Sequence, residues 1–266
     1  MLLAGAGMTL VCQVALAERE AFAGLPAGQS AQVLQNPGFL VGYSDSRRQP
    51  LWVAYRAESL KGRRLGKRPP FEPDPRVSMP VMPQDYRGSH YTRGHLAPNY
   101  LIGKLYGRKA QRATFLMSNI SPQRAQLNSL VWQRLEDAEA KVVAPGAVEL
   151  WALAGPVFGE QRALKKSGVA LPEAFYRIWL DVRDGEPWAL AFVVPQNVCG
   201  TEPLSKFLSS VDEIERRTGL DFFGELPDPQ EDALERATSI EGWRLDRYDR
   251  QPPYYGNKFD LSKCAD

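Results

Sequence analysis

The chain has 266 residues, of which 24% are charged and 44% hydrophobic, and this ordinary globular composition excludes a mostly disordered, collagen-like or coiled-coil protein. Its 33 Lys and Arg residues nearly balance 31 Asp and Glu residues, and a net charge of only +2 taken alone argues against a nucleic-acid partner. There are two histidines, His90 and His95, and three cysteines, with neither a Cys-x-x-Cys pair nor a His-Glu-x-x-His motif. The common zinc sites are therefore disfavoured.

The first 17 residues form an apolar run without charged side chains that ends in Ala15-Leu16-Ala17, a pattern that signal peptidase can cut. The run is shorter than the roughly 20 apolar residues of a permanent membrane anchor. No basic residue precedes it, so either the start of the sequence is truncated or the segment is a buried helix. We expect a signal peptide over 1–17 and a periplasmic or secreted protein without a membrane anchor after processing. Its removal would take Cys12 and leave Cys199 and Cys264 either as a disulfide or as two unpaired thiols.

Apolar runs and turn residues predict an α+β fold with one main domain over 43–250, after a connecting segment over 18–42 that lacks a clear period. A basic loop is expected over 61–70, and prolines make 71–83 an extended loop. A polar, Tyr-rich tail follows over 251–266.

Regular elements are expected in six further segments. Strands are predicted at 51–55, 148–154, 175–180 and 188–194. The last of these is almost entirely apolar and is therefore placed at the centre of a sheet. Helices are predicted at 124–143, where Pro145-Gly146 would end the helix, and at 204–218, where Gly219 would be the C-cap.

The small net charge conceals an uneven distribution along the chain. Residues 44–124 hold sixteen Lys and Arg against five Asp and Glu, a balance of +11, and the rest holds 17 against 26, a balance of −9. Both histidines lie in the basic segment. An asymmetry of this size around the histidines predicts a site for a polyanion, although a solvated basic surface is the simpler alternative.

Three residues in and just after this segment have the chemistry of a metal-assisted reaction. His95 follows a cation and a glycine in the run Thr92-Arg93-Gly94-His95, and an imidazole titrates in the range useful for a general base. Asn128 and Glu136 are eight residues apart on the predicted helix, so an α-helix would offset them by only about 80°. An amide oxygen and a carboxylate suit Mg²⁺. Each residue alone could instead be a surface, cap or turn residue.

These segments resemble the DNA/RNA non-specific endonuclease family, the ββα-metal or His-Me finger nucleases that include mitochondrial endonuclease G. The Arg-Gly-His-Leu-Ala-Pro run at 93–98 matches the family signature, the Asn-Ile-Ser-Pro-Gln run at 119–123 matches a second block, and Asn128, Trp132 and Glu136 match its helix. The resemblance spans about residues 40 to 227. One position departs from the pattern, because Thr92 stands where the family has Asp.

The resemblance implies a mainly antiparallel central sheet flanked by helices, with a ββα-metal finger as the active site. It implies Mg²⁺ as the cofactor, with Mn²⁺ as an alternative, and His95 as general base. Asn128 would be the direct metal ligand, and Glu136 would act at the metal through its water. The remaining implied site residues contact or support the phosphate: Arg93, Asn119 and, from the basic loop, Arg68, with Arg64 as the second choice.

The implied activity is endonucleolytic hydrolysis of DNA, with RNA as a second substrate left open, because contacts to phosphate carry no sequence information. Two alternatives remain. The loss of the family Asp favours a weakened member that binds nucleic acid without cleaving it, and the same metal site could serve a phosphodiesterase for a smaller substrate. The oligomeric state is left open, a homodimer included.

Overall fold

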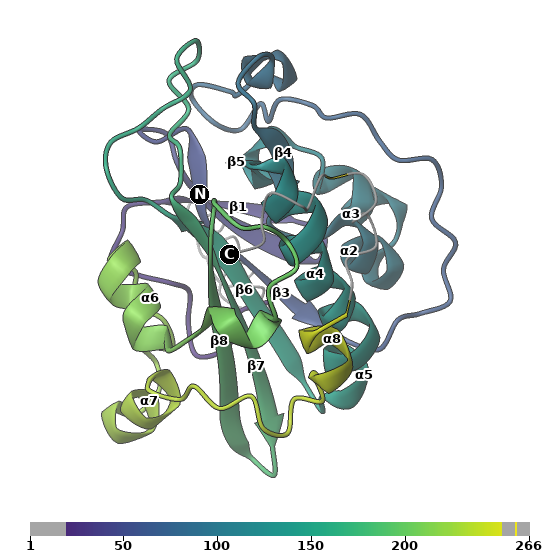
Figure 1. The fold of residues 1–266 in the computed structure, drawn as a ribbon, viewed down its shortest axis with the longest axis vertical. Coiled ribbons are helices and arrows are strands. Elements are labelled where there is room, and N and C mark those ends of the chain that lie inside the picture. Colours follow the sequence, from purple (N-terminus) through teal and green to yellow (C-terminus); the bar gives the residue numbers. More distant parts are fainter. Residues whose placement is uncertain (1–19, 252–258, 260–266) are drawn as a thin grey trace, which may run out of the picture.

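A computed structural model describes residues 20–251 and 259 and consists of a seven-stranded sheet with helices packed on its two faces (Figure 1). The strand order is β1-β2-β3-β6-β7-β8-β9, and every neighbouring pair is antiparallel. The predicted α+β class with a mainly antiparallel sheet is confirmed. The strands of this sheet are β1 Gln32–Asn36, β2 Phe39–Ser44, β3 Gln49–Ala57, β6 Leu150–Val157, β7 Ala174–Arg183, β8 Glu186–Pro195 and β9 Leu208–Ser209.

Alternate side chains of each strand enter two separate cores, one on each face of the sheet. On β7, for example, Phe175 and Trp179 belong to the core under the long central helix, while Tyr176 and Ile178 belong to the core under the helices over 211–218 and 228–235. Because helices cover both faces, β6 and most of β7 are buried on both sides.

The strand that the sequence places at the centre of the sheet is not central. β8 lies second from the edge and pairs on its outer side only with the two-residue β9. Its apolar middle is buried because helices lie above and below it, whereas Trp188 near its start remains 48% exposed. Burial by helices on both faces therefore explains the apolar run without a central position.

The segment predicted as a connection over 18–42 contains part of the sheet. β1 and β2 form an antiparallel hairpin in which Asn36 pairs with Phe39, and β2 pairs with β3. The turn is Pro37-Gly38, where Gly38 has a φ of 81°, a value that favours glycine. Only Leu34 of β1 is buried. Because this edge strand has a single inward side chain, its sequence shows no alternation of apolar and polar residues from which a strand could be predicted.

The predicted helix over 124–143 is confirmed and is irregular. It comprises a π-helical turn Leu127–Trp132, α4 Gln133–Ala138, a second π-helical turn Glu139–Val143 and α5 Ala144–Gly146. It ends at Pro145-Gly146 as expected. The other α-helices are α2 Asn99–Tyr106, α3 Arg108–Ala113, α6 Val211–Thr218, α7 Asp228–Glu235 and α8 Asp246–Asp249.

The helix predicted from residue 204 begins later. A 3-10 turn Leu204–Phe207 and β9 come first, and α6 starts after Ser210, whose hydroxyl accepts a hydrogen bond from the Glu213 N–H at 3.1 Å. Gly219 ends the helix in the left-handed conformation, as predicted.

The predicted signal peptide over 1–17, the tail beyond residue 251 except residue 259, and Cys264 lie outside the described residues. Both alternatives for Cys199 and Cys264, a disulfide or two unpaired thiols, therefore stay open. Within 20–251 and at 259, no helix combines the length and apolarity that crossing a membrane requires.

Candidate active site

A small hairpin and the long helix form a ββα unit beside the main sheet. β4 Thr92–His95 pairs antiparallel with β5 Ile120–Gln123, and the helix begins directly after β5 (Figure 1). Gly94 is required in this hairpin, because a Cβ there would lie 2.0 Å from the Gln123 side chain. The indole N–H of Trp132 donates to the His95 carbonyl at 3.1 Å and ties the helix to the end of β4.

The His95 imidazole lies in an aromatic enclosure. It is 6% exposed, and its ring centroid lies 4.7 Å from that of Phe115 and 5.4 Å from that of Phe71. Within the described residues its Nε2 has no hydrogen-bonding partner. Burial, with the charge of Arg68 added to it, lowers the pKa of His95 to about 3. The ring is therefore unprotonated at neutral pH and can accept a proton.

The two predicted arginines stand against the same aromatic rings. The guanidinium of Arg93 lies over Phe71 at 4.5 Å from the ring centroid, and that of Arg68 lies over Phe115 at 5.3 Å. Both side chains belong to exposed residues. The charge of Arg68 acts on the pKa values of both His95 and Glu136, which supports Arg68 over Arg64 as the cation of the basic loop.

The amide of Asn128 is oriented by Thr92, the residue that departs from the family pattern. The Thr92 hydroxyl donates its one proton to the Gln123 carbonyl at 2.8 Å, so its contact with Asn128 at 2.9 Å requires the NH₂ group of the amide as donor. The Oδ1 atom of Asn128 is thereby left for another partner. A threonine thus performs an orienting role here without a carboxylate.

Glu136 lies on the same helix, four residues after Trp132, which itself lies four residues after Asn128. The wider π-helical turn over Leu127–Trp132 alters the rotation between them, so the offset of an ideal α-helix does not hold. Burial raises the pKa of the half-buried Glu136 carboxyl to about 8, although the charge of Arg177 lowers it. An ionised carboxylate is a ligand type that Mg²⁺ prefers, and Glu136 supplies one once its carboxyl has lost its proton.

Asn119 supports the site from below. It is completely buried, its Oδ1 accepts from the Ala97 N–H at 2.9 Å, and its Nδ2 donates to the carbonyls of Ala97 and Thr114 at 3.1 and 2.9 Å. These backbone bonds hold the chain that follows His95. Of the two roles considered for Asn119, the geometry favours support of the site over contact with phosphate.

Sequence reasoning missed a buried charge network beneath the site. Glu139 accepts hydrogen bonds from Tyr55 at 2.6 Å and from Trp179 at 2.7 Å, and it forms an ion pair with Arg177. Arg177 also donates to the Leu96 carbonyl at 3.2 Å. The signal for this network was the arginine inside the apolar run of β7, a position where a charge must find a partner.

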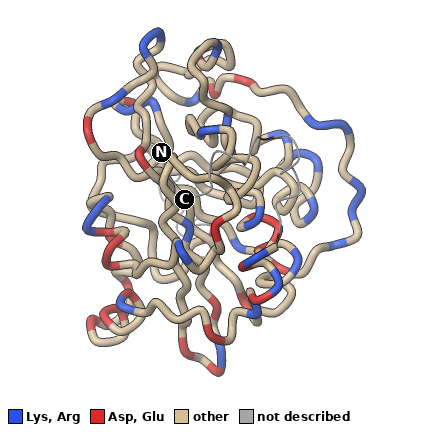
Figure 2. Tube along the Cα trace, in the orientation of Figure 1, with Lys and Arg blue, Asp and Glu red and all other residues tan. Residues whose placement is uncertain are grey.

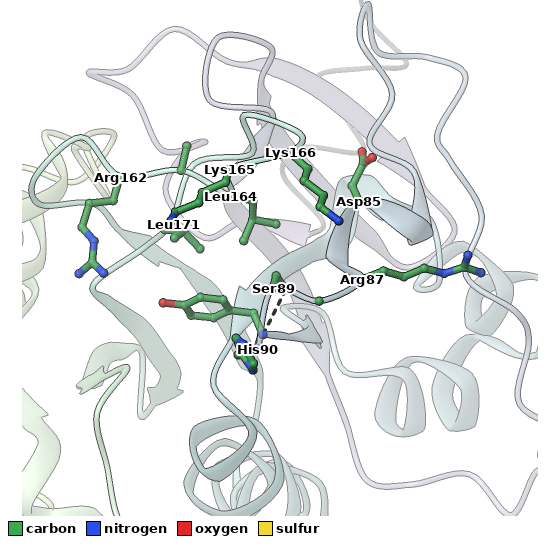
Figure 3. Close-up of a pocket in the computed structure, with 12 residues that line it drawn as sticks. Asp85, Arg87, Ser89, His90, Arg162, Leu164, Lys165, Lys166 and Leu171 are labelled. Carbon is green, nitrogen blue, oxygen red and sulfur yellow. Dashed lines mark hydrogen bonds between the residues drawn. The ribbon is translucent and has the colours of Figure 1, made fainter.

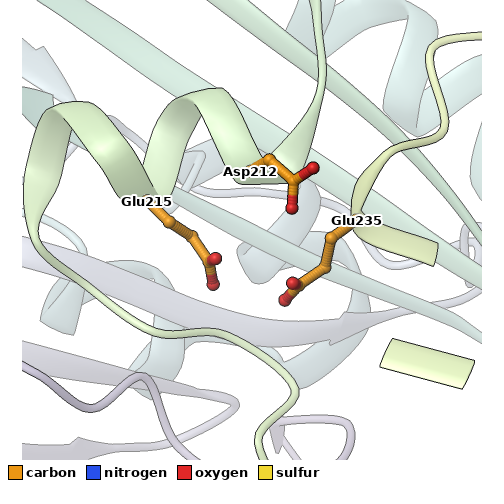
Figure 4. A group of neighbouring side chains, drawn as sticks. All are labelled: Asp212, Glu215 and Glu235. Carbon is orange, nitrogen blue, oxygen red and sulfur yellow. The ribbon is translucent and has the colours of Figure 1, made fainter. Parts of the chain in front are cut away.

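A group of three carboxylates lies on the other face of the sheet. Asp212 and Glu215 on α6 and Glu235 on α7 place ligand atoms within 4.8 Å of one another (Figure 4). These helices pack on the core opposite the one that contains Trp132. The group is therefore separate from the predicted metal residues Asn128 and Glu136.

Charged residues follow the division seen in the sequence. Lys and Arg lie along the loop over 61–70 and around α2 and α3, whereas Asp and Glu gather at α6 and α7 (Figure 2). Since Arg68 of this loop lies over Phe115, which packs against His95, the basic half of the molecule contains the candidate site.

Comparison with known proteins agrees with this geometry. Residues 21–229 match the model of the DNA/RNA non-specific endonuclease family. The chain is 32% identical over 206 residues to human mitochondrial nuclease EXOG, a match that covers 70% of this chain and 55% of that protein. It is 29% identical over 216 residues to human mitochondrial endonuclease G, covering 75% and 71%, and 27% identical over 230 residues to a nuclease of Serratia marcescens, covering 82% and 85%. The chain thus spans little more than half the length of human EXOG.

The fold is also that of a solved structure. The crystal structure of the EndoG/EndoGI complex, which concerns the mechanism of EndoG inhibition, matches with a TM-score of 0.68 at 23% identity and covers 79% of this chain and 90% of that one. From the match over 21–229 and the ββα arrangement around His95, we conclude that the chain belongs to the DNA/RNA non-specific endonuclease family.

Proposed function

We propose that this chain is a Mg²⁺-dependent endonuclease that hydrolyses phosphodiester bonds in DNA and RNA without sequence preference, with His95 as general base. One observation carries the proposal: the buried, unprotonated imidazole of His95 lies within the electrostatic influence of Arg68, and the His95 backbone carbonyl accepts a hydrogen bond from Trp132 on the helix that presents Asn128 and Glu136. The family described as DNA/RNA non-specific endonuclease supports the substrate class.

In this mechanism His95 takes a proton from the water that attacks phosphorus. Its low pKa keeps the ring neutral before substrate binds. A phosphate next to the ring raises this pKa, because a negative charge favours the imidazolium form. The base therefore becomes stronger when substrate is in place. Arg93 and Arg68 bind the phosphate oxygens and stabilise the negative charge that grows in the transition state.

The residues present fit a hard cation. Thr92 holds the amide nitrogen of Asn128 and leaves Oδ1 as a ligand, and Glu136 offers a carboxyl whose pKa is raised mainly by burial. When bound, Mg²⁺ would neutralise phosphoryl charge and stabilise the leaving oxygen. Mn²⁺ has the same preference for oxygen ligands and is the alternative ion.

Cleavage of plasmid DNA tests the proposal. We expect purified protein to nick and linearise plasmid with Mg²⁺ and to stop when EDTA is added. His95→Ala should lose at least about a hundredfold in rate, because general-base catalysis contributes on that order, while retaining Mn²⁺ binding; Asn128→Ala should lose both. Intact plasmid that is merely retarded on a gel would favour the non-catalytic alternative. A small chromogenic diester cleaved far faster than plasmid would favour the phosphodiesterase.

We further propose that the protein acts outside the cytoplasm. The apolar run before Glu18 supports export, and bacterial nucleases of Serratia marcescens and a Nostoc strain are among its relatives. Expression of the full chain followed by fractionation tests this: the processed protein should start near residue 18 and lie in the periplasm or medium.

A further inference from the structure

Three cavities meet at Tyr91, the residue directly before β4. One, of about 420 Å³, is lined by Thr92 and Arg93 of the candidate active site. A second, of about 560 Å³, extends from Arg87 and His90 to a loop over 162–171. A third, of about 320 Å³, continues toward Arg124. Tyr91 lines all three, so the cavities adjoin one another, and we call them together the groove.

Cations that no carboxylate neutralises line the largest of these cavities. Within the part of the chain that the structure describes, Arg87, Arg162, Lys165 and Lys166 make no ion pair. The cavity has one acidic residue, Asp85, and its carboxylate is already engaged by the Arg48 guanidinium at 3.6 Å and the Met82 N–H at 2.9 Å. Figure 3 shows Arg162, Lys165 and Lys166 on one side and Arg87 and His90 on the other. The rim is therefore suited to phosphates.

The floor of this cavity is apolar. Leu164 is buried in a small core cluster, against which Tyr91 and Leu171 pack. A cationic rim over an apolar and aromatic floor is the combination that binds single strands, because phosphates meet the cations and unpaired bases lie on the floor. Bases of a duplex are stacked and paired, and so are not free to enter.

The loop that carries three of the cations is already ordered. Leu171 N–H donates to the Arg162 carbonyl at 2.8 Å, Leu164 N–H donates to Val169 at 2.8 Å, and Ala170 N–H donates to Arg47 at 3.1 Å. A fixed loop loses little further entropy on binding. His90 lines the opposite wall and has a φ of 64°, in the left-handed region.

We propose that this groove binds the single-stranded nucleic acid that flanks the scissile phosphate, with bases on the Tyr91 and Leu171 floor and phosphates on Arg162, Lys165 and Lys166. This inference rests on the proposed nuclease function and deepens it, since it assigns an unpaired strand as the preferred substrate. It also gives a role to cations outside the basic segment 44–124.

Binding in EDTA tests the groove without relying on cleavage. We expect R162Q/K165Q/K166Q in the full chain to weaken binding of a labelled single-stranded oligonucleotide at least about tenfold, since three phosphate contacts are lost. The control R216Q/R236Q/R247Q makes the same change in net charge at exposed residues on and beyond α6, and it should change the dissociation constant less than twofold. The same three substitutions should weaken binding of a duplex of matched sequence much less than they weaken binding of the single strand. Tyr91→Leu keeps the apolar packing and should cost about fivefold on the single strand by removal of the aromatic face.

Hydrolysis of a small diester separates this inference from the proposed function. Its rate should be unchanged in the groove variant, because none of the three substituted cations, Arg162, Lys165 and Lys166, belongs to the proposed catalytic residues. If wild-type protein cleaves neither plasmid nor diester yet the groove variant loses single-strand binding selectively, the nuclease function fails and the groove stands. Equal losses for single strand and duplex, or equal losses in groove and control variants, would overturn the groove.

Discussion

The amide of Asn128 can turn either its oxygen or its nitrogen toward the candidate metal, and a single hydroxyl decides which. The Thr92 hydroxyl donates its proton to the Gln123 carbonyl and must therefore accept a hydrogen bond from the Asn128 nitrogen. The substitution that seemed to weaken the family motif thus supplies the orientation by another route. A ligand held in one orientation binds its ion without a further ordering cost.

Replacement of Thr92 tests this role. Thr92→Val keeps the shape of the side chain and removes both hydrogen bonds, so we expect Mn²⁺ affinity and kcat/KM to fall about tenfold, at the lower end of the effect of losing a partner that orients a ligand. Thr92→Ser keeps the hydroxyl and should stay near wild type. Equal Mn²⁺ affinity in Thr92→Val and Thr92→Ser would show that the hydroxyl of residue 92 does not orient Asn128.

Arg68 should control the pH dependence of the reaction through His95. Its positive charge helps to lower the pKa of the imidazole, so removal of the charge raises that pKa. Because the base is lost as pH falls through its pKa, the acid limb of kcat/KM in Arg68→Gln should move to higher pH, with a rate loss of about tenfold or more from the missing phosphate contact. Arg64→Gln, a control in the same exposed loop, should leave the limb in place. An unmoved limb in Arg68→Gln would mean that Arg68 does not act on the base.

At the scale of elements, carboxyl groups of α6 and α7 lie close together where the two helices meet, and they repel one another when charged. Glu235 is 7% exposed, and burial together with the neighbouring charge of Glu215 raises its pKa to about 8 (Figure 4). The pKa of Glu215 is also raised by burial, while its Oε1 accepts from the Phe222 N–H at 2.7 Å. Asp212 and Glu231 add negative charge to the same group. The two helices therefore pack best when Glu235 carries a proton.

Stability should consequently fall as pH rises. In the unfolded chain Glu235 titrates near its usual value of about 4.3, whereas in the folded protein it keeps its proton until about pH 8. The folded state binds more protons between these values, so the free energy of unfolding decreases across this window as pH increases. We expect the Tm to drop by several degrees from pH 6 to pH 9, measured by thermal unfolding, and Glu235→Gln to remove much of the drop. Glu241→Gln, an exposed control, should keep the wild-type dependence; the same drop in both variants would assign it to other groups.

The elements that sequence patterns predicted are those in which local chemistry and burial agree. The helix over 124–143 has an apolar stripe and a Pro-Gly stop, and Gly219 has the conformational freedom that its C-cap position requires. β1 was missed because its single inward residue leaves no alternation. The π-helical turns were also missed, since i to i+5 bonding has no residue pattern of its own.

The sequence predicts the residues of the candidate site but not the contacts that support them. Motifs that resemble those of the family predict His95, Asn128 and Glu136 as site residues, and their roles stay predictions. The Phe71 and Phe115 enclosure and the Arg177–Glu139 pair depend on long-range packing, which brings residues from separate strands and loops to one place. Such contacts become visible only when the sheet order is known.

At the scale of the whole molecule, a net charge near zero hides two oppositely charged regions. The basic loop over 61–70 and the segments around His95 form one, and the acidic helices α6 and α7 belong to the other (Figure 2). Over a Debye length of about 8 Å at physiological salt, a polyanion responds to the region that it approaches and not to the total. Nucleic acid should therefore associate with the candidate site as it would with a basic protein, despite the net charge near zero.

The salt dependence of cleavage tests this division. Plotted against log salt concentration, log kcat/KM for duplex DNA should fall steeply. R64Q/K67Q, which removes two exposed cations of the basic loop, should reduce the slope by about 2 if both contact phosphates. R216Q/R236Q makes the same change in net charge on α6 and just after α7, where both arginines are exposed and paired with carboxylates, and should leave the slope unchanged. If the slope fell by the same amount in both variants, the overall field of the protein, and not the local basic region, would guide the substrate. Hydrolysis of a small diester with one phosphate should stay nearly independent of salt in all three proteins, because it releases few counterions.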